Sequence, residues 1–76
     1  EDHDYAIWAN RYVDALETTS HPIKKLREEH HLSESAIRAI LNRARDRRLL
    51  TKSPQGRAGG VLTKKAMNLL NELGDN

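Results

Sequence analysis

The sequence contains no cysteine, which excludes a disulfide framework and a thiolate metal site. Aromatic residues are scarce as well, with one tryptophan, two tyrosines and no phenylalanine. No apolar run approaches the roughly 18 residues that span a bilayer, and no signal-peptide pattern opens the chain. Together these absences favour a protein that stays in the cytoplasm and does not enter a membrane.

A length of 76 residues allows one small domain, residues 1–76. A chain of this size buries only about 60–65% of its unfolded surface, so its core is modest and leaves little room for a substrate pocket. The chain does not begin with methionine, and we therefore expect a fragment of a longer protein or a processed chain. Residues 1–3 and 74–76 are expected to be frayed ends.

The formal net charge of +2 conceals a segregated distribution of charge. Residues 1–20 hold five acids and one base, and residues 66–76 hold two acids. Residues 21–65, in contrast, hold twelve lysines and arginines against four acids. A basic middle between acidic ends is typical of a domain with one face for a polyanion, and chance clustering is the alternative.

Apolar residues recur at helical spacing in four segments, residues 4–18, 22–30, 33–48 and 64–73. In the first segment Trp8 is expected to anchor the core, because it offers a large apolar area. Pro22 suits the first turn of the second segment, and Leu32 is expected to point inward from the turn that follows. Thr63 can cap the last segment and Gly74 can end it. The inward stripe of that last segment is Ala66, Leu69, Leu70 and Leu73.

The segment 33–48 has two different faces. Ser33 stands at its start, where a hydroxyl can accept from the first free backbone N–H groups, and Glu34 suits the helix dipole. Its apolar stripe is Ile37, Ile40, Leu41 and Ala44. The opposite side mixes small residues with long hydrogen-bond donors: Ser35, Arg38, Ala39, Asn42, Arg43 and Asp46. A helix in a major groove needs short side chains near the DNA and Arg or Asn at base edges, although a solvated arginine-rich surface has the same composition.

Residues 49–63 differ from the helical segments. Residues 49–52 change from apolar to polar, and residues 61–63 are apolar or β-branched. The two stretches flank a run of turn formers, so the sequence predicts a β-hairpin with a flexible tip. Lys52, Gln55 and Arg57 lie at this tip among three glycines, where they can reach a sugar-phosphate strand, and an ordinary solvated loop is the alternative. The predicted fold is mainly α with a small β-hairpin, in the order helix, helix, turn, helix, hairpin, helix.

Residues that would support other chemistry do not come together in the sequence. His30 and His31 are adjacent, so their side chains diverge on a helix, and no cysteine or carboxylate cluster stands at ligand spacing. Residues 56–60 lack the Lys-Ser/Thr that completes a phosphate-binding loop. We therefore expect no catalytic residue, no metal site, no cofactor and no enzymatic activity.

The order of elements resembles the winged helix-turn-helix superfamily of bacterial transcription regulators. Three stretches carry the resemblance: residues 32–38 (LSESAIR), which open the central helix, residues 49–51 (LLT), which lead into the first wing strand, and residues 56–63 (GRAGGVLT). The resemblance covers most of residues 20–73, and it extends to small actinobacterial regulator-type proteins with a GRAGG-x-LT wing. Arg48 departs from the family, since many relatives have glycine before the wing strand, and we expect a less sharp bend there.

The resemblance implies sequence-specific binding of double-stranded DNA in transcription regulation, by a cytoplasmic, nucleoid-associated protein. Helix 33–48 would lie in the major groove and wing 51–62 on the backbone or in the minor groove. The candidate DNA-binding residues are Lys24, Ser33, Ser35, Arg38, Ala39, Asn42, Arg43, Lys52, Gln55 and Arg57. The alternative is a protein-interaction or dimerisation module, in which the acidic first helix with Tyr5 and Trp8 docks a basic partner, a second copy or another domain of a longer chain.

Overall fold

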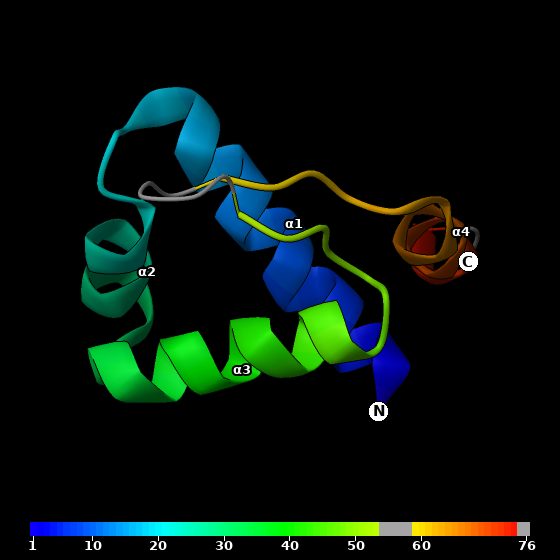
Figure 1. The fold of residues 1–76 in the computed structure, drawn as a ribbon, viewed down its shortest axis with the longest axis horizontal. Helices are drawn as coiled ribbons and strands as arrows, with labels where there is room; N and C mark the ends of the chain where they lie inside the picture. The colour runs from blue at the N-terminus through cyan, green and yellow to red at the C-terminus, as the bar shows by residue number, and fades with distance from the viewer. Residues whose placement is uncertain (54–58, 75–76) are drawn as a thin grey trace.

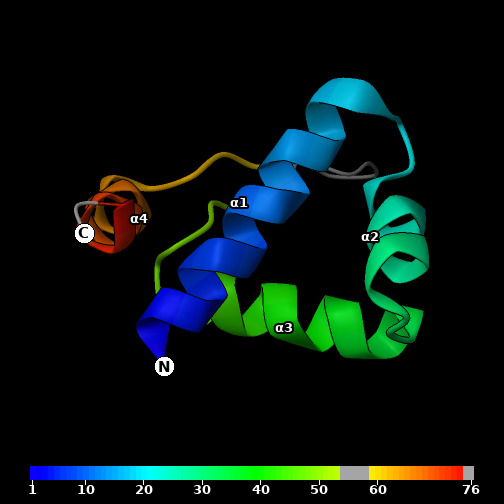
Figure 2. The ribbon, with the colours of Figure 1, turned by 180° about the vertical axis from the view of Figure 1, so that it is seen from behind.

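The computed structural model describes residues 1–53 and 59–74, and this part of the chain forms four helices (Figure 1). They are α1 (Asp2–Thr18), α2 (Pro22–His30), α3 (Glu34–Asp46) and α4 (Lys64–Gly74). α1 runs through the middle of the molecule and packs against each of the other three helices. In both views, α2 stands at the N-terminal end of α3, and α4 lies beyond the C-terminal end of α3 (Figure 2). The mainly helical fold class is thus confirmed.

The predicted capping residues stand at the starts of α3 and α4. Ser33 Oγ accepts a hydrogen bond from the Ala36 N–H at 3.1 Å, and Thr63 Oγ1 accepts one from the Ala66 N–H at 3.2 Å. Each bond satisfies one of the backbone donors that a helix start leaves free. Pro22 occupies the first turn of α2, as predicted from the tolerance of proline at that position.

The core gathers the inner side of α1 and one stripe of each other helix. In α1 the three alanines Ala6, Ala9 and Ala15 are at most 2% exposed, and such small residues allow neighbouring helices to approach closely. The buried cluster comprises Ala6, Ala9, Tyr12, Leu26, Ile37, Leu41, Ala44, Leu49, Leu50 and Ala66. Leu32 is half-buried and packs against this cluster, which confirms that it points inward. Across the described residues, none of the helices combines the length and the apolarity that crossing a bilayer requires.

Two apolar residues do not take the positions expected of them. Trp8 is only half-buried and lies outside the core cluster, with its ring 4.9 Å from both the Arg11 guanidinium and the His30 ring. Its expected role as core anchor is wrong, because Ala9 faces inward and Trp8 lies about 100° around the helix from it. Leu73 is 42% exposed, so the inward stripe of α4 ends at Leu70.

The first helix begins earlier than its apolar pattern suggested. Asp2 and His3 belong to α1, so the expectation that residues 1–3 are frayed is wrong for these two. Asp2 contacts the Arg47 guanidinium, and His3 Nε2 lies 3.1 Å from Glu72 Oε2 on α4. Partners far along the chain therefore order the start of the helix, which periodicity alone could not indicate.

A sharp turn ends α3. Arg48 has φ 62° and is in the left-handed conformation, its N–H donates to the Arg45 carbonyl, and the Leu49 N–H donates to the Ala44 carbonyl, both at 2.9 Å. This pair of bonds is the Schellman motif, in which glycine usually takes the left-handed position. The expectation of a less sharp bend at Arg48 is therefore wrong. Complete burial of Leu49 directly after the turn explains why arginine is held in this conformation.

Residues 49–53 and 59–63 lie antiparallel between α3 and α4, but the described residues contain one bridge and no strand. The bridge joins Leu50 to Leu62. The Thr51 N–H donates to the Val61 carbonyl at 3.0 Å, whereas the Val61 N–H is taken by Thr51 Oγ1 at 2.8 Å. Together with Gly60, whose φ is 125°, this side-chain bond interrupts the extended pairing. Residues 54–58 lie outside the described residues.

We predict that Arg48→Gly stabilises the fold by about 0.5–1 kcal/mol. Glycine avoids the penalty of about 1–2 kcal/mol for a left-handed L-residue, and this gain exceeds its larger loss of chain entropy. The bond from Thr63 Oγ1 to the carbonyl of residue 48 remains available. In thermal unfolding the gain corresponds to an increase in Tm of about 2–8 °C for a domain of this size.

Arg48→Ala is the matched control for this experiment, because it removes the same charge but keeps the backbone strain. Equal Tm values for the glycine and alanine variants would show that the left-handed conformation of residue 48 is not the source of the effect.

Candidate nucleic-acid interface

α3 attaches to the core by one side and exposes the other. Ile37, Leu41 and Ala44 are at most 2% exposed, in agreement with the predicted apolar stripe. Ile40, the fourth residue of that stripe, is only half-buried and lies outside the core cluster. The predicted outer face is exposed to solvent along its whole length: Ser33, Ser35, Arg38, Ala39, Asn42, Arg43 and Asp46. The candidate residues on α3 therefore share one open surface.

The polar side chains of this surface have weak contacts within the molecule. Arg38 Nε donates to Glu34 Oε2 at 3.0 Å, and the two side chains are 60% and 54% exposed. An exposed helical pair of this kind contributes only about 0.3–0.5 kcal/mol, so Arg38 can readily exchange Glu34 for another partner. Arg43 Nη1 lies 3.5 Å from Tyr5 Oη, at the outer limit of a hydrogen bond.

The start of α2 adds a lysine next to this surface. A hollow of about 210 Å³ lies between the first turns of α2 and α3, and Lys24 and Arg38 both line it, together with Glu34 and residues 20–23. The structure therefore brings together two candidate residues that are 14 positions apart in the sequence.

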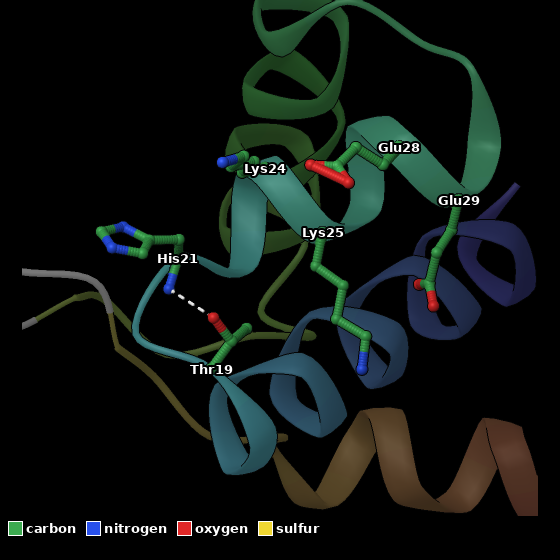
Figure 3. Close-up of a pocket in the computed structure, with 6 residues that line it drawn as sticks. All are labelled: Thr19, His21, Lys24, Lys25, Glu28 and Glu29. Carbon is green, nitrogen blue, oxygen red and sulfur yellow. Dashed lines mark hydrogen bonds between the residues drawn. The ribbon is translucent and has the colours of Figure 1, made fainter.

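A second hollow of about 420 Å³ continues along α2 (Figure 3). Figure 3 shows Lys24 and Lys25 in the same groove as the carboxylates of Glu28 and Glu29, so the charge of this groove is mixed. Lys25 Nζ also donates to Thr18 Oγ1 at 2.9 Å, which ties it to the end of α1. The surface around Arg38 is therefore the more favourable one for an anion.

The candidate residues beyond α3 are only partly placed. Lys52 is exposed. Gln55 and Arg57 lie outside the described residues, so their position relative to Arg38 and Asn42 stays a prediction.

Arg45 is a residue that our sequence analysis did not single out. Its Nε donates to the Thr51 carbonyl at 3.0 Å, and its Nη2 donates to Ser53 Oγ at 2.8 Å and to the Gly59 carbonyl at 3.2 Å. The guanidinium lies 5.7 Å from the centre of the Tyr12 ring, and Tyr12 Oη accepts from the Gly59 N–H at 3.2 Å. The sequence offered one signal for this role. Arg45 directly follows the apolar stripe residue Ala44, so its side chain leaves the helix at the border of the core and can reach a neighbouring segment.

Arg47 and Lys65 use their charge inside the molecule. Arg47 Nη1 donates to Asp2 Oδ1 at 2.6 Å, and Lys65 Nζ lies 3.3 Å from Asp2 Oδ2. Lys65 Nζ also donates to the Arg47 carbonyl at 3.1 Å, and the Arg47 guanidinium stacks 4.7 Å from the Tyr5 ring centre. These contacts join the end of α3 to the starts of α1 and α4, so part of the basic charge is neutralised by the acidic first helix.

The same contacts shift two pKa values. Hydrogen bonds from Arg47, and then from Lys65, hold the pKa of Asp2 below its ordinary value of 3.8. The hydrogen bond to Asp2 raises the pKa of Arg47 in turn. Both groups are therefore charged throughout the neutral range.

Comparison of the chain with protein-family models, with curated proteins and with solved structures finds no match in any of the three. Function is therefore inferred from the sequence and from the geometry of this surface. That surface combines an exposed arginine and asparagine helix face with a lysine of the neighbouring helix.

We predict that Asp2→Asn removes a pH-dependent part of the stability. Because the folded pKa of Asp2 is lowered, its ionised form stabilises the fold above the ordinary value of 3.8, and this contribution is lost as the pH falls through the lowered folded pKa. The Tm of the wild type should exceed that of Asp2→Asn at neutral pH, and the difference should shrink as the pH falls below 3.8 and through the lowered folded pKa.

Asp14→Asn, at another exposed aspartate of α1, is the control. It should leave the pH dependence of Tm close to that of the wild type. A Tm difference between wild type and Asp2→Asn that stays constant with pH would contradict the proposed role of this carboxylate.

Proposed function

We propose that this chain is a winged helix-turn-helix domain that binds double-stranded DNA in transcription regulation, with α3 in the major groove. The observation that carries the proposal is the exposed side of α3, on which Arg38, Asn42 and Arg43 stand beside the small Ser35 and Ala39. α3 has 13 residues and is therefore about 20 Å long, a suitable length for a groove about 12 Å wide.

The order of side chains on α3 suits base recognition. Ser35 and Ala39 are one helical turn apart, so their short side chains let the backbone approach the floor of the groove. Arg38 and Asn42 form a parallel line on the same side of the helix. Arginine suits the two acceptors of guanine and asparagine the donor and acceptor of adenine, and each good bidentate pair contributes about 1–3 kcal/mol of discrimination.

Contacts to phosphate would supply most of the affinity. Lys24 at the start of α2 lies beside Arg38, in the place where the first helix of the motif crosses the DNA backbone. The antiparallel segments 49–53 and 59–63 are proposed as the base of the wing, with Lys52, Gln55 and Arg57 directed to the backbone or the minor groove. Neutralisation of about four to six phosphates would give a slope of log affinity against log salt of about −4 to −5.

Protein binding is the second candidate, and one observation favours it. Among the helices of the described part of the chain, α1 is the one against which α4 packs, and Met67 on α4 is 47% exposed. Val61, shortly before α4, is 60% exposed. A dimer by light scattering, together with no binding to duplex DNA at low salt, would favour this function over DNA binding.

We predict that Arg38→Ala and Asn42→Ala each weaken the recognition of a specific DNA sequence. Duplexes selected from a random pool by the wild-type chain serve as the specific ligand, and affinity is measured by fluorescence anisotropy at several salt concentrations. Each variant should lose about 1–3 kcal/mol toward the selected duplex and little toward random duplex, because base contacts carry the discrimination. Asn42→Ala should leave the salt slope unchanged, since asparagine is uncharged.

Arg11→Ala, which removes one exposed arginine from α1, is the control and should leave the sequence preference unchanged. If both α3 variants kept the affinity and the sequence preference of the wild type, α3 would not be the element that recognises DNA.

A further inference from the structure

We infer that Arg45 is the positioning residue that holds the base of the proposed wing, residues 49–53 and 59–63, against α3, without contacting DNA itself. This inference rests on the proposed function. It adds the residue through which the groove contact of α3 and the backbone contact of Lys52 are coupled.

The guanidinium of Arg45 joins both sides of the segment that leaves α3 and returns to α4. It donates to Thr51 and Ser53 on the outgoing side and to Gly59 on the returning side. Ser53 Oγ also lies 3.3 Å from the Gly59 carbonyl, so the two sides are linked across the guanidinium. The planar fork of arginine allows several directed bonds at once, which the single ammonium of lysine does not reproduce.

Tyr12 extends this network to α1. It is 3% exposed, its ring lies below the Arg45 guanidinium, and its hydroxyl accepts from the Gly59 N–H. The segment is therefore fastened to two helices, of which α3 carries the candidate base-reading residues. These contacts hold Ser53 and Gly59 in place relative to α3 and α1.

Arg45 is poorly placed to bind DNA itself. It is half-buried, whereas Arg38 and Arg43 on the same helix are exposed. Turning its side chain toward a phosphate would leave the carbonyls of Thr51 and Gly59 without this donor. The bond to the Gly59 carbonyl is part-buried, and loss of a charged hydrogen-bond donor is costly for such an acceptor.

Lys52 is the residue whose position depends most directly on this network. It lies between Thr51 and Ser53, and Arg45 bonds to both. Arg45 therefore holds the backbone that carries Lys52 in place relative to α3. A lysine held in a fixed place can neutralise a particular phosphate, whereas a lysine on a loosened segment samples many positions.

A double-mutant cycle of Arg45→Gln and Lys52→Ala tests the inference by salt-dependent binding to duplex DNA. In the wild-type background Lys52→Ala should reduce the magnitude of the salt slope by about 1 and weaken binding several-fold. In the Arg45→Gln background the same change should have almost no further effect, because the lysine is no longer held. Lys24→Ala, on α2, is the matched control and should keep its full effect in both backgrounds.

Two outcomes would overturn the inference. If Lys52→Ala has the same effect in both backgrounds, Arg45 stabilises the fold but does not position the wing. If Arg45→Gln reduces the slope by about 1 and Lys52→Ala reduces it by a further 1, Arg45 is itself a phosphate contact. Ser53→Ala offers a milder variant if Arg45→Gln unfolds, since it removes the hydroxyl next to Lys52 that accepts from Arg45 Nη2. The effect of Lys52→Ala should be reduced in this background, and a full effect would overturn the inference.

A measurement without DNA separates this inference from the proposed function. The ¹⁵N heteronuclear NOE of the Lys52 and Ser53 amides should fall in Arg45→Gln, and that of Gly59 should fall in Tyr12→Phe. Unchanged values would overturn the positioning role even in a wild-type chain that binds DNA. Absence of any DNA binding by the wild type, with the expected loss of NOE in the variants, would instead overturn the proposed function alone.

Discussion

The packing of the α3 apolar stripe into the same core as the α1 alanines is the contact on which the rest of the molecule depends. Ile37, Leu41 and Ala44 are buried together with Ala6 and Ala9, and none of these side chains is more than 2% exposed. Dispersion contacts in such a close-packed core are lost by small displacements, so they hold α3 at a defined rotation about its axis. The exposure of the opposite side, with its arginines and asparagine, is a direct consequence.

Charge has a second, structural use in this domain. The basic middle of the sequence predicts one face for a polyanion, but Arg45, Arg47 and Lys65 are engaged within the fold. Arg47 and Lys65 form ion pairs with the carboxylate of Asp2. The guanidinium of Arg45 donates hydrogen bonds to oxygens of the segment that follows α3. The acidic start of α1 is therefore an internal counter-charge at the end of α3. Among the other basic residues, Lys24 of α2 and Arg38 of α3 line the hollow between these two helices.

Local signals predicted the helices well. α2 has the expected bounds, Ser33 and Thr63 cap α3 and α4 as their hydroxyls indicated, and the outer face of α3 is exposed. The errors arose where a neighbour outside the helix decides the outcome. Alanines, and not Trp8, occupy the inward positions of α1. Arg48 has a left-handed conformation because the next residue, Leu49, is completely buried.

The sequence by itself determined where the helices lie, how two of them begin and which side of α3 is apolar. These properties depend on residues three or four positions apart, whose interactions are present in any helix that forms. Only the tertiary structure decided the roles of Arg45, Arg47 and Asp2. Arg47 and Asp2 are 45 positions apart, and Tyr12 and Gly59 are 47 positions apart, so no local pattern could pair them before the core had brought α1 beside α3.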